Sequence, residues 1–186
     1  MTTKLYYSEK TIKEWVHNIM REMRSDGFTP DYVVGLTRGG LNPASMISYY
    51  LDVPMHTLDV RLRDGTDTGP ESNLWMAEDA FGYLPTDVVP RTEDSATTDA
   101  STRKNILIVD DINDTGATLN WIKQDWQSGC LLSGPAWDDI WGNNVRIAVL
   151  VDNAISEFKD VDYVGTTINK LENPIWVVFP WEEWWR

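Results

Sequence analysis

Residues that hold metals or form disulfides are scarce in this chain of 186 residues, which contains one cysteine, Cys130, and two histidines, His17 and His56. One cysteine excludes a disulfide within the chain, and the two histidines form no cluster with the spacing of a transition-metal site. No apolar run approaches the roughly 18 residues of a membrane span, and the N-terminal segment Met1–Lys4 lacks a signal-peptide core. We therefore expect a cytoplasmic protein without membrane attachment.

Basic residues are also few, because 16 lysines and arginines stand against 29 aspartates and glutamates, for a formal charge of −13. Proteins that bind DNA or RNA need basic patches to contact the phosphates, so this balance argues against nucleic acid as a partner. The length is enough for one core and too short for two typical domains. We expect a single domain over residues 1–186.

The most informative segment present is residues 106–119, with the sequence Ile-Leu-Ile-Val-Asp-Asp-Ile-Asn-Asp-Thr-Gly-Ala-Thr-Leu. Its four leading apolar residues predict a buried parallel strand, and ligands bind where such strands end. Asp110 and Asp111 follow at once and can accept hydrogen bonds from a ribose diol or hold a hard cation such as Mg²⁺. The small, hydroxyl-rich turn after them predicts a phosphate site at the start of a helix. An ordinary strand running into a capped helix would not explain the acidic pair.

This segment resembles the phosphoribosyl-pyrophosphate (PRPP) signature of the type I phosphoribosyltransferases, a hydrophobic strand followed by two acidic residues and, three positions later, a residue before Thr-Gly and a hydroxyl. The resemblance implies that Asp110 and Asp111 hold the ribose hydroxyls and Mg²⁺, directly or through water. It places the 5′-phosphate on Asp114, Thr115, Gly116, Ala117 and Thr118. It also implies PRPP and a purine base as ligands, Mg²⁺ as cofactor, and a homo-oligomer, either a dimer or a tetramer.

Hydrophobic periodicity predicts helices and strands in alternation. A helix is expected over residues 9–24 with Ser8 as its N-cap, and another with Asn42 as N-cap and Pro43 at its first position. A further helix is expected over 119–127. Strands are predicted over 32–36, 54–61, 106–109, 145–151, 163–168 and 176–179. This alternation predicts an α/β fold with a mostly parallel central sheet and helices on both faces.

Residues about 64–103 break the alternation, with nine acidic and two basic residues among Gly, Pro, Ser and Thr. A long irregular insertion in a compact domain is usually a lid or a disordered segment. The resemblance implies a flexible hood over the site at this position. The apolar clusters 74–76 and 81–84 either dock on the body or form a small satellite subdomain.

The turn Leu-Thr-Arg-Gly-Gly-Leu at residues 36–41 resembles the pyrophosphate loop of the 6-oxopurine phosphoribosyltransferases. Backbone N–H groups at Gly39 are able to face pyrophosphate, and the Arg38 guanidinium can give a bidentate contact to its oxygens. The alternative is a glycine-rich connection with an exposed arginine.

The C-terminal segment, about 152–186, is expected to bind the base, because Trp-Val-Val-Phe-Pro-Trp-Glu at 176–182 resembles the base-binding end of bacterial xanthine-guanine phosphoribosyltransferases. The resemblance implies that Trp176 stacks on the purine and that the Val177 carbonyl meets its far edge, with simple packing as the alternative. In those enzymes a lysine about ten residues before an Asp-Tyr-Val contacts the 6-oxo group. Here the ungapped count gives Asn153, and Lys159 or Lys170 fits only if the alignment shifts.

Asp114 points to the 6-oxopurine subclass, since the adenine and orotate enzymes usually carry Ala at this position. A carboxylate there can accept the ring proton that the purine sheds, although Asp also commonly shapes turns. We therefore predict an enzyme that joins guanine, xanthine or hypoxanthine to PRPP, with nucleoside monophosphate and pyrophosphate as products. The alternative is a sensor of PRPP or nucleotide on the same fold, without turnover.

Overall fold

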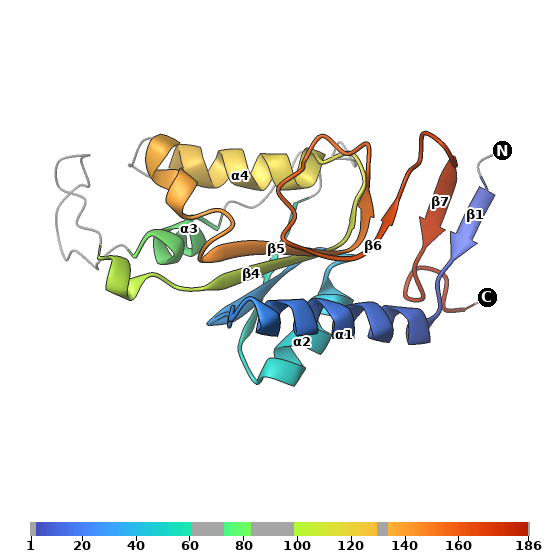
Figure 1. The fold of residues 1–186 in the computed structure, drawn as a ribbon, viewed down its shortest axis with the longest axis horizontal. Helices are drawn as coiled ribbons and strands as arrows, with labels where there is room; N and C mark the ends of the chain where they lie inside the picture. Colours follow the sequence, from blue (N-terminus) through green and yellow to red (C-terminus); the bar gives the residue numbers. More distant parts are fainter. Residues whose placement is uncertain (1–2, 61–72, 83–98, 130–133, 186) are drawn as a thin grey trace.

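The computed structural model describes residues 3–60, 73–82, 99–129 and 134–185 (Figure 1). A parallel sheet of five strands in the order β3-β2-β4-β5-β6 forms its centre. The strands are Tyr32–Leu36 (β2), Met55–Leu58 (β3), Ile106–Asn113 (β4), Val145–Asn153 (β5) and Tyr163–Ile168 (β6). The predicted α/β class with a parallel sheet is confirmed.

Helices cover both faces of this sheet (Figure 1). Helices α1 (Glu9–Ser25) and α2 (Leu41–Leu51) pack on one face, and α3 (Leu74–Phe81) and α4 (Ala117–Gly129) on the other. Short 3-10 turns lie at Ala100–Thr102 (η1) and Gly134–Asp139 (η2). Among the described residues, a membrane-crossing helix is absent, because none combines the length and the apolar character that a span needs.

Strand β4 shows why two cores form. Ile106 and Ile108 belong to the cluster under α3 and α4, whereas Leu107 and Val109 belong to the cluster under α1 and α2. Successive strand residues point to opposite faces, so an unbroken apolar run supplies both cores at once. All four side chains are at most 1% exposed.

Helix α1 begins and ends as the sequence predicts. The Ser8 side chain accepts a hydrogen bond from the Thr11 backbone N–H at 3.1 Å, which satisfies one of the unpaired donors of the first turn. The helix stops before Gly27, whose φ of +69° is costly for residues with a Cβ.

Helix α2 begins earlier than predicted, which corrects the assignment of Asn42 as its N-cap. Gly40 is the N-cap, without a side-chain hydrogen bond, and Pro43 is the third helical residue rather than the first. The Gly40 N–H donates to the Leu36 carbonyl at 3.0 Å, so the chain turns into the helix directly after β2. Pro43 is still tolerated, because donors in the first turn have no partner within the helix.

A second, smaller sheet was only half predicted. Strand β7 (Ile175–Val178) agrees with the prediction for 176–179, but it pairs in parallel with β1 (Thr3–Tyr6), a strand that the sequence pattern did not indicate. The Lys4 ammonium and the Glu183 carboxylate, 2.6 Å apart, join the two ends of the chain beside this sheet. The C-terminal segment therefore pairs with the N-terminus, and its Val177 and Phe179 also belong to the core cluster under α1 and α2.

Part of the insertion about 64–103 belongs to the core. Helix α3 buries Met76 of the first apolar cluster and Phe81 of the second, together with Ala77 and Ala80, so both clusters contribute residues to the core. The Phe81 ring packs edge-on against Trp137 at 4.5 Å. The stretches 64–72 and 83–98, where the hood is expected, lie outside the described residues.

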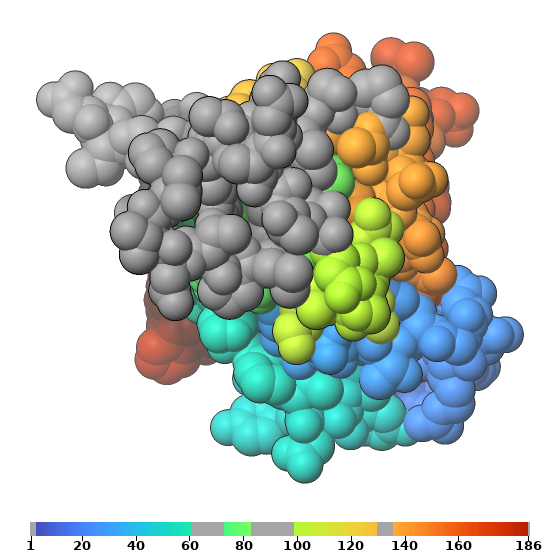
Figure 2. All heavy atoms as spheres, turned by 90° about the vertical axis from the view of Figure 1, so that its left-hand side faces the viewer, coloured from blue at the N-terminus to red at the C-terminus, as the bar shows by residue number. Residues whose placement is uncertain are grey.

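Backbone and side-chain hydrogen bonds close the amino edge of the sheet. Asn144 Nδ2 donates to the carbonyls of Ala80 (2.8 Å) and Lys104 (3.0 Å), and the Asn105 N–H donates to Asp31 Oδ2 (2.7 Å). Figure 2 views this end of the molecule, where the yellow-green residues before β4 adjoin orange residues on one side and blue residues below. These bonds tie α3 and the strand starts into one unit.

Phe81→Ala should destabilise the protein by about 3–5 kcal/mol, because it removes a buried ring and leaves a cavity against Trp137. Urea unfolding followed by tryptophan fluorescence measures the change. Tyr49→Ala is the matched control, since Tyr49 is 87% exposed, and its effect should stay within about 0.5 kcal/mol. Equal, small effects of both substitutions would show that α3 is not anchored in the core.

Candidate active site

The candidate site lies at the carboxyl edge of the sheet, where the neighbours of β4 end at different points. Strand β2 pairs with β4 only as far as Val109, whereas β5 continues beside it to Asn113. Asp110 and Asp111 therefore lie beyond the last β2 residue that pairs with β4, Gly35, while β5 still pairs with Asp110 and Ile112 on either side of Asp111. Strand β4 extends four residues past the predicted 106–109, and the acidic pair belongs to the strand itself. Such an edge is where open α/β sheets place ligands.

The turn after β2 packs directly on the acidic pair. A Cβ atom at Gly39 would lie 1.8 Å from Asp111 Oδ2, and one at Gly40 would lie 2.3 Å from the Val109 carbonyl oxygen. Gly40 needs glycine because backbone atoms already fill the space of a side chain, whereas a side chain at position 39 would displace the Asp111 carboxylate. The structure thus brings together Gly39 and Asp111, two residues that the sequence analysis assigned to neighbouring parts of one ligand.

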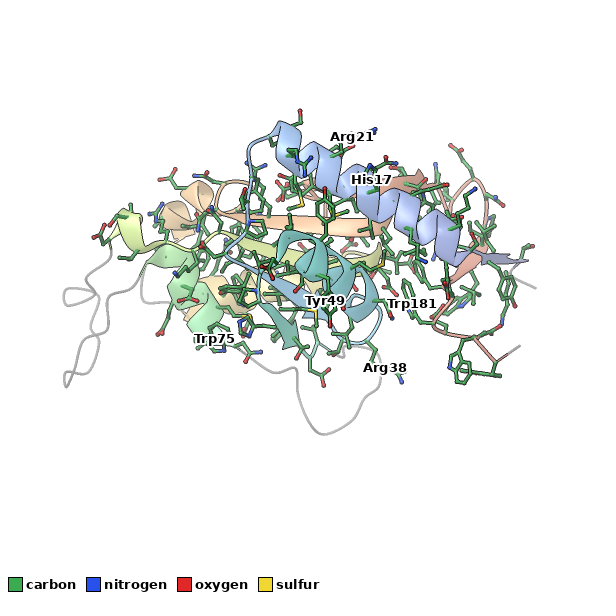
Figure 3. All side chains as sticks on the ribbon, turned by 90° about the horizontal axis from the view of Figure 1, so that it is seen from below. His17, Arg21, Arg38, Tyr49, Trp75 and Trp181 are labelled. Carbon is green, nitrogen blue, oxygen red and sulfur yellow. The ribbon has the colours of Figure 1, made fainter. Side chains whose placement is uncertain are left out.

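Arg38 lies on the outer side of this turn, with its exposed side chain pointing away from the body (Figure 3). The peptide bond before it is cis. The preceding Thr37 is anchored, since its Oγ1 donates to Asp59 Oδ1 at 2.8 Å. The arginine is therefore at the mouth of the site, where a bound anion would be within the reach of a long side chain.

Burial dominates the electrostatics of the pair. Burial first, and the negative charge of Glu182 second, raise the pKa of Asp111, hydrogen bonds with Asp110 and the backbone lower it, and the pKa that results is about 6. The Asp111 N–H itself donates to Asp110 Oδ1 at 2.9 Å. The sequence analysis missed Glu182, whose carboxylate also accepts from the Phe179 N–H at 2.8 Å. Its place in the 176–182 motif was the available signal.

The acidic pair makes an incomplete metal site. Among residues 3–60, 73–82, 99–129 and 134–185, no three His, Cys, Asp or Glu side chains are grouped as metal ligands. Mg²⁺ is commonly held by only one or two carboxylates, with water and substrate phosphates as its other ligands. Asp110 and Asp111 fit a magnesium ion that is shared with a phosphorylated ligand.

The predicted phosphate turn leads straight into α4. Gly116 has φ of +87°, and a Cβ there would lie 2.4 Å from the Phe158 backbone nitrogen. Only glycine accommodates both this conformation and this contact. Thr115 Oγ1 accepts from the Ala117 N–H at 3.3 Å, and Thr118 is half-buried in the first turn of α4. Small residues thus line the helix N-terminus, where backbone N–H groups favour an anion.

A buried polar network supports this turn from below. Asn113 Nδ2 donates to Asp152 Oδ1 (2.7 Å) and to the Phe158 carbonyl (3.0 Å), while Asn113 Oδ1 accepts from Ser156 Oγ (2.8 Å). Asn113 and Ser156 are 2% and 1% exposed. Because buried polar atoms are costly to leave unpaired, these bonds fix the turn relative to the loop after β5.

Asp114 lies in a cluster of three side chains from three strand ends. Its Oδ2 is 2.8 Å from the Lys170 ammonium, and its Oδ1 accepts from Asn153 Nδ2 at 3.1 Å. Asn153 Nδ2 also donates to the Asp114 carbonyl, and Asn153 Oδ1 accepts from the Lys170 N–H at 3.2 Å. The Asn153 amide, 3% exposed, is thus engaged with Asp114 and Lys170. That Asn153 contacts a base stays a prediction.

Trp176 and Val177 lie in β7, outside the central sheet. Trp176 is 50% exposed and opposite Lys4 in the register, whereas Val177 is buried at 7% exposure. The exposed side chain of Trp176 leaves room for a base to stack on it, and this stacking stays a prediction. Trp181 instead stacks on Phe179, with ring centroids 5.0 Å apart and planes 4° apart, so its ring serves packing.

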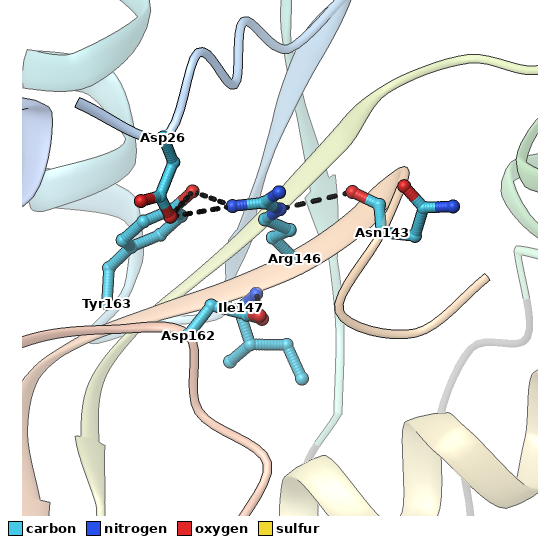
Figure 4. A network of polar contacts seen from close by, with 6 residues as sticks. All are labelled: Asp26, Asn143, Arg146, Ile147, Asp162 and Tyr163. Carbon is cyan, nitrogen blue, oxygen red and sulfur yellow. Dashed lines mark hydrogen bonds and ion pairs between the residues drawn. The ribbon is translucent and has the colours of Figure 1, made fainter. Parts of the chain in front are cut away.

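Another polar network lies at the opposite, amino edge of the sheet (Figure 4). Arg146 Nη1 donates to Asp26 Oδ2 at 2.9 Å and to the Tyr163 hydroxyl, and Asp162 Oδ2 accepts from the Ile147 N–H at 2.8 Å. Burial raises the pKa of Asp162 and, to about 12, that of Tyr163. This network fastens the end of α1 to β5 and β6.

The comparisons with known proteins agree with this geometry. The model of the family described as phosphoribosyl transferase domain matches residues 2–185. No curated protein matches the sequence significantly.

Among similar solved structures is a purine phosphoribosyltransferase from Pyrococcus horikoshii Ot3, with 23% identity, TM-score 0.62 and coverage of 98% of this chain and 96% of that one. A xanthine-guanine-hypoxanthine phosphoribosyltransferase from Helicobacter pylori has 17% identity and TM-score 0.61, with 96% and 92% covered. A hypothetical protein from Neisseria gonorrhoeae with bound ppGpp has 17% identity and TM-score 0.57, with 98% and 90% covered. At these identities the likeness is one of fold.

Asp111→Asn should stabilise the protein above pH 6 and leave its stability unchanged near pH 4. The folded protein holds the Asp111 proton more tightly than the unfolded chain, so ionisation of this carboxyl costs stability as the pH rises from about 4 to about 6. The amide removes this cost, and the gain above pH 6 should be about 1–3 kcal/mol.

Urea unfolding at several pH values measures the difference between the two proteins. Asp139→Asn is the control, because it removes the same charge from an exposed carboxylate, which has no cost of burial to lose. A stability difference for Asp111→Asn that is the same at pH 4 and pH 8 would contradict the raised pKa.

Proposed function

This chain belongs to the phosphoribosyl transferase domain family, whose members are transferases, and we propose that it transfers the 5-phosphoribosyl group of PRPP to a 6-oxopurine. The bases are guanine, xanthine or hypoxanthine, and the products are the nucleoside monophosphate and pyrophosphate, as in purine salvage. The observation that carries the proposal is the packing of the 36–41 turn on Asp111, beside a glycine turn that opens α4.

PRPP has three recognisable parts, and the site offers a different chemistry for each. Its ribose diol matches the two carboxylates of Asp110 and Asp111, which accept hydrogen bonds. The 5′-phosphate matches the N–H groups of residues 114–118 at the N-terminus of α4. The pyrophosphate group matches the backbone at Gly39 and the guanidinium of Arg38.

In the reaction a ring nitrogen of the purine bonds to C1 of the ribose while the bond from C1 to the pyrophosphate oxygen breaks. The ring nitrogen then loses a proton, for which Asp114 is the proposed acceptor. Asp110 and Asp111 would hold Mg²⁺ together with PRPP, and the bound cation would offset the charge of the pyrophosphate. The negative charges of the acidic pair also favour the cation-like ribose of the transition state.

The direct test is a steady-state assay of the purified protein with PRPP, Mg²⁺ and each of guanine, xanthine, hypoxanthine, adenine and orotate. The proposal expects nucleoside monophosphate with one or more of the three 6-oxopurines. PRPP binding without turnover of any base would instead identify a sensor on this fold.

Asp110→Asn combined with Asp111→Asn should abolish PRPP binding, because the two amides remove both negative charges and place N–H donors against the ribose hydroxyls. The fold should stay intact. Calorimetric titration with PRPP and Mg²⁺ measures the affinity. Asp138→Asn combined with Asp139→Asn is the matched control, since these two adjacent carboxylates are exposed on η2. Wild-type affinity in the first double variant would overturn the assignment of the acidic pair.

Asp114→Asn should lower kcat by roughly 10²–10⁴-fold with a much smaller change in PRPP affinity, if the carboxylate is the proton acceptor. Single-turnover kinetics and PRPP titration separate the two effects. The amide retains the size of the side chain and its contact with Asn153. An unchanged kcat would assign Asp114 to shaping of the turn.

A further inference from the structure

The turn that opens α4 rests on the 154–158 loop, which leads from β5 toward β6. The Glu157 N–H of this loop donates to the Thr115 carbonyl of the turn at 3.0 Å. A Cβ atom at Gly116 would lie 2.9 Å from Ser156 Oγ. Loop and turn are therefore in direct contact, and no space is left between them for a side chain at position 116.

Two buried side chains, Ser156 and Asn113, connect the 154–158 loop to the end of β4. Ser156 Oγ donates to Asn113 Oδ1 at 2.8 Å and accepts from the Phe158 N–H at 3.2 Å. Asn113 Nδ2 donates to the Phe158 carbonyl and to Asp152 Oδ1. A hydroxyl has one donor and an amide has two, so every donor of both side chains is used inside this network. The network fixes how far the loop lies from the strand.

The 154–158 loop is also held on its other side. Lys159 Nζ donates to the Ala154 carbonyl at 2.7 Å, which closes the loop on itself. The Phe158 ring is 3% exposed and belongs to the core cluster under α3 and α4, and the Lys123 ammonium lies 6.0 Å from its centroid. The turn therefore has a support that is anchored in the core.

The shape of the turn decides how well it binds an anion. Backbone N–H groups bind a phosphate well when several of them point at it, and their directions follow from the conformation of the turn. Ser156 and Asn113 are 1% and 2% exposed, so they act on a ligand through the turn and not by contact. The turn at residues 36–41 has its own contact with the acidic pair. A loosened 154–158 loop should therefore weaken the binding of one phosphate and spare the pyrophosphate group.

We infer that Ser156 and Asn113 are positioning residues that set the affinity for the 5′-phosphate, by holding the 154–158 loop against the turn at Gly116. The inference rests on the proposed function, because it assigns the turn to the 5′-phosphate of the same ligand. It gives the segment after β5 a role in phosphate binding in addition to the expected contacts with the base.

The test measures three dissociation constants by calorimetry for wild type and Ser156→Ala. Ribose 5-phosphate carries the 5′-phosphate alone, pyrophosphate with Mg²⁺ carries the other group alone, and PRPP with Mg²⁺ carries both. Ser128→Ala is the matched control, because the Ser128 hydroxyl donates to the Asp125 carbonyl at 3.1 Å near the opposite end of α4. Urea unfolding verifies that each variant is folded.

Ser156→Ala should weaken ribose 5-phosphate and PRPP by about 10-fold, since it leaves Asn113 Oδ1 and the Phe158 N–H without their partner. Pyrophosphate should stay within about 2-fold of wild type, and Ser128→Ala should change none of the three. Ser156→Cys should fall between wild type and Ser156→Ala, because a thiol is a weaker donor. Asn113→Ala should weaken the same two ligands, and adding Ser156→Ala to it should have a smaller effect than Ser156→Ala alone, since the two side chains share one network.

Unchanged affinities in a folded Ser156→Ala variant would overturn the inference. So would an equal loss for all three ligands, which would make Ser156 a general structural residue of the site. If the wild type forms no nucleotide but binds ribose 5-phosphate in a way that depends on Ser156, the proposed activity fails and the inference holds. If it binds neither ribose 5-phosphate nor PRPP, both fail.

Discussion

The unequal ends of the strands beside β4 are the constraint on which the candidate site depends. Up to Val109 the strand has a partner on each side, and beyond it only β5 remains. Because β2 no longer pairs with β4 there, the turn after β2 has room beside the acidic pair. Strand β5 continues alongside and keeps the backbone of the pair extended. If β2 were longer, it would cover the pair. If β5 were shorter, the pair would lie in a loop without fixed geometry.

A cost in stability accompanies this arrangement. Asp111 is buried against Gly39 with Glu182 nearby, and these surroundings disfavour its ionised form. A core made only for stability would carry neutral groups here, because buried carboxylates without a cation are unfavourable. The apolar clusters on the two faces of the sheet offset the cost, and β4 contributes to both of them. A ligand that brings positive charge to Asp111 would bind more tightly, because it would offset the negative charge that the protein leaves uncompensated there.

The Asp114 cluster solves a similar problem in another way. Here the carboxylate already has a cation, Lys170, and an amide, Asn153, so the charges are balanced before any ligand arrives. The three residues come from the ends of β4, β5 and β6, and parallel pairing brings these ends to one edge. The position of each side chain therefore depends on strand register as much as on its own sequence neighbours.

The sequence by itself determined the parallel α/β class, the α1 boundaries and the strands 32–36 and 163–168, because periodicity and caps act over a few residues. It also marked the acidic pair and the glycine turns, whose chemistry is local to one motif. The tertiary structure decided what depends on distant segments. Pairing of β1 with β7, the extension of β4 beside β5, and the meeting of Lys170 with Asp114 across 56 positions of sequence all arise from the alignment of neighbouring strands. No local pattern encodes such an alignment, since each partner contributes only half of the contact.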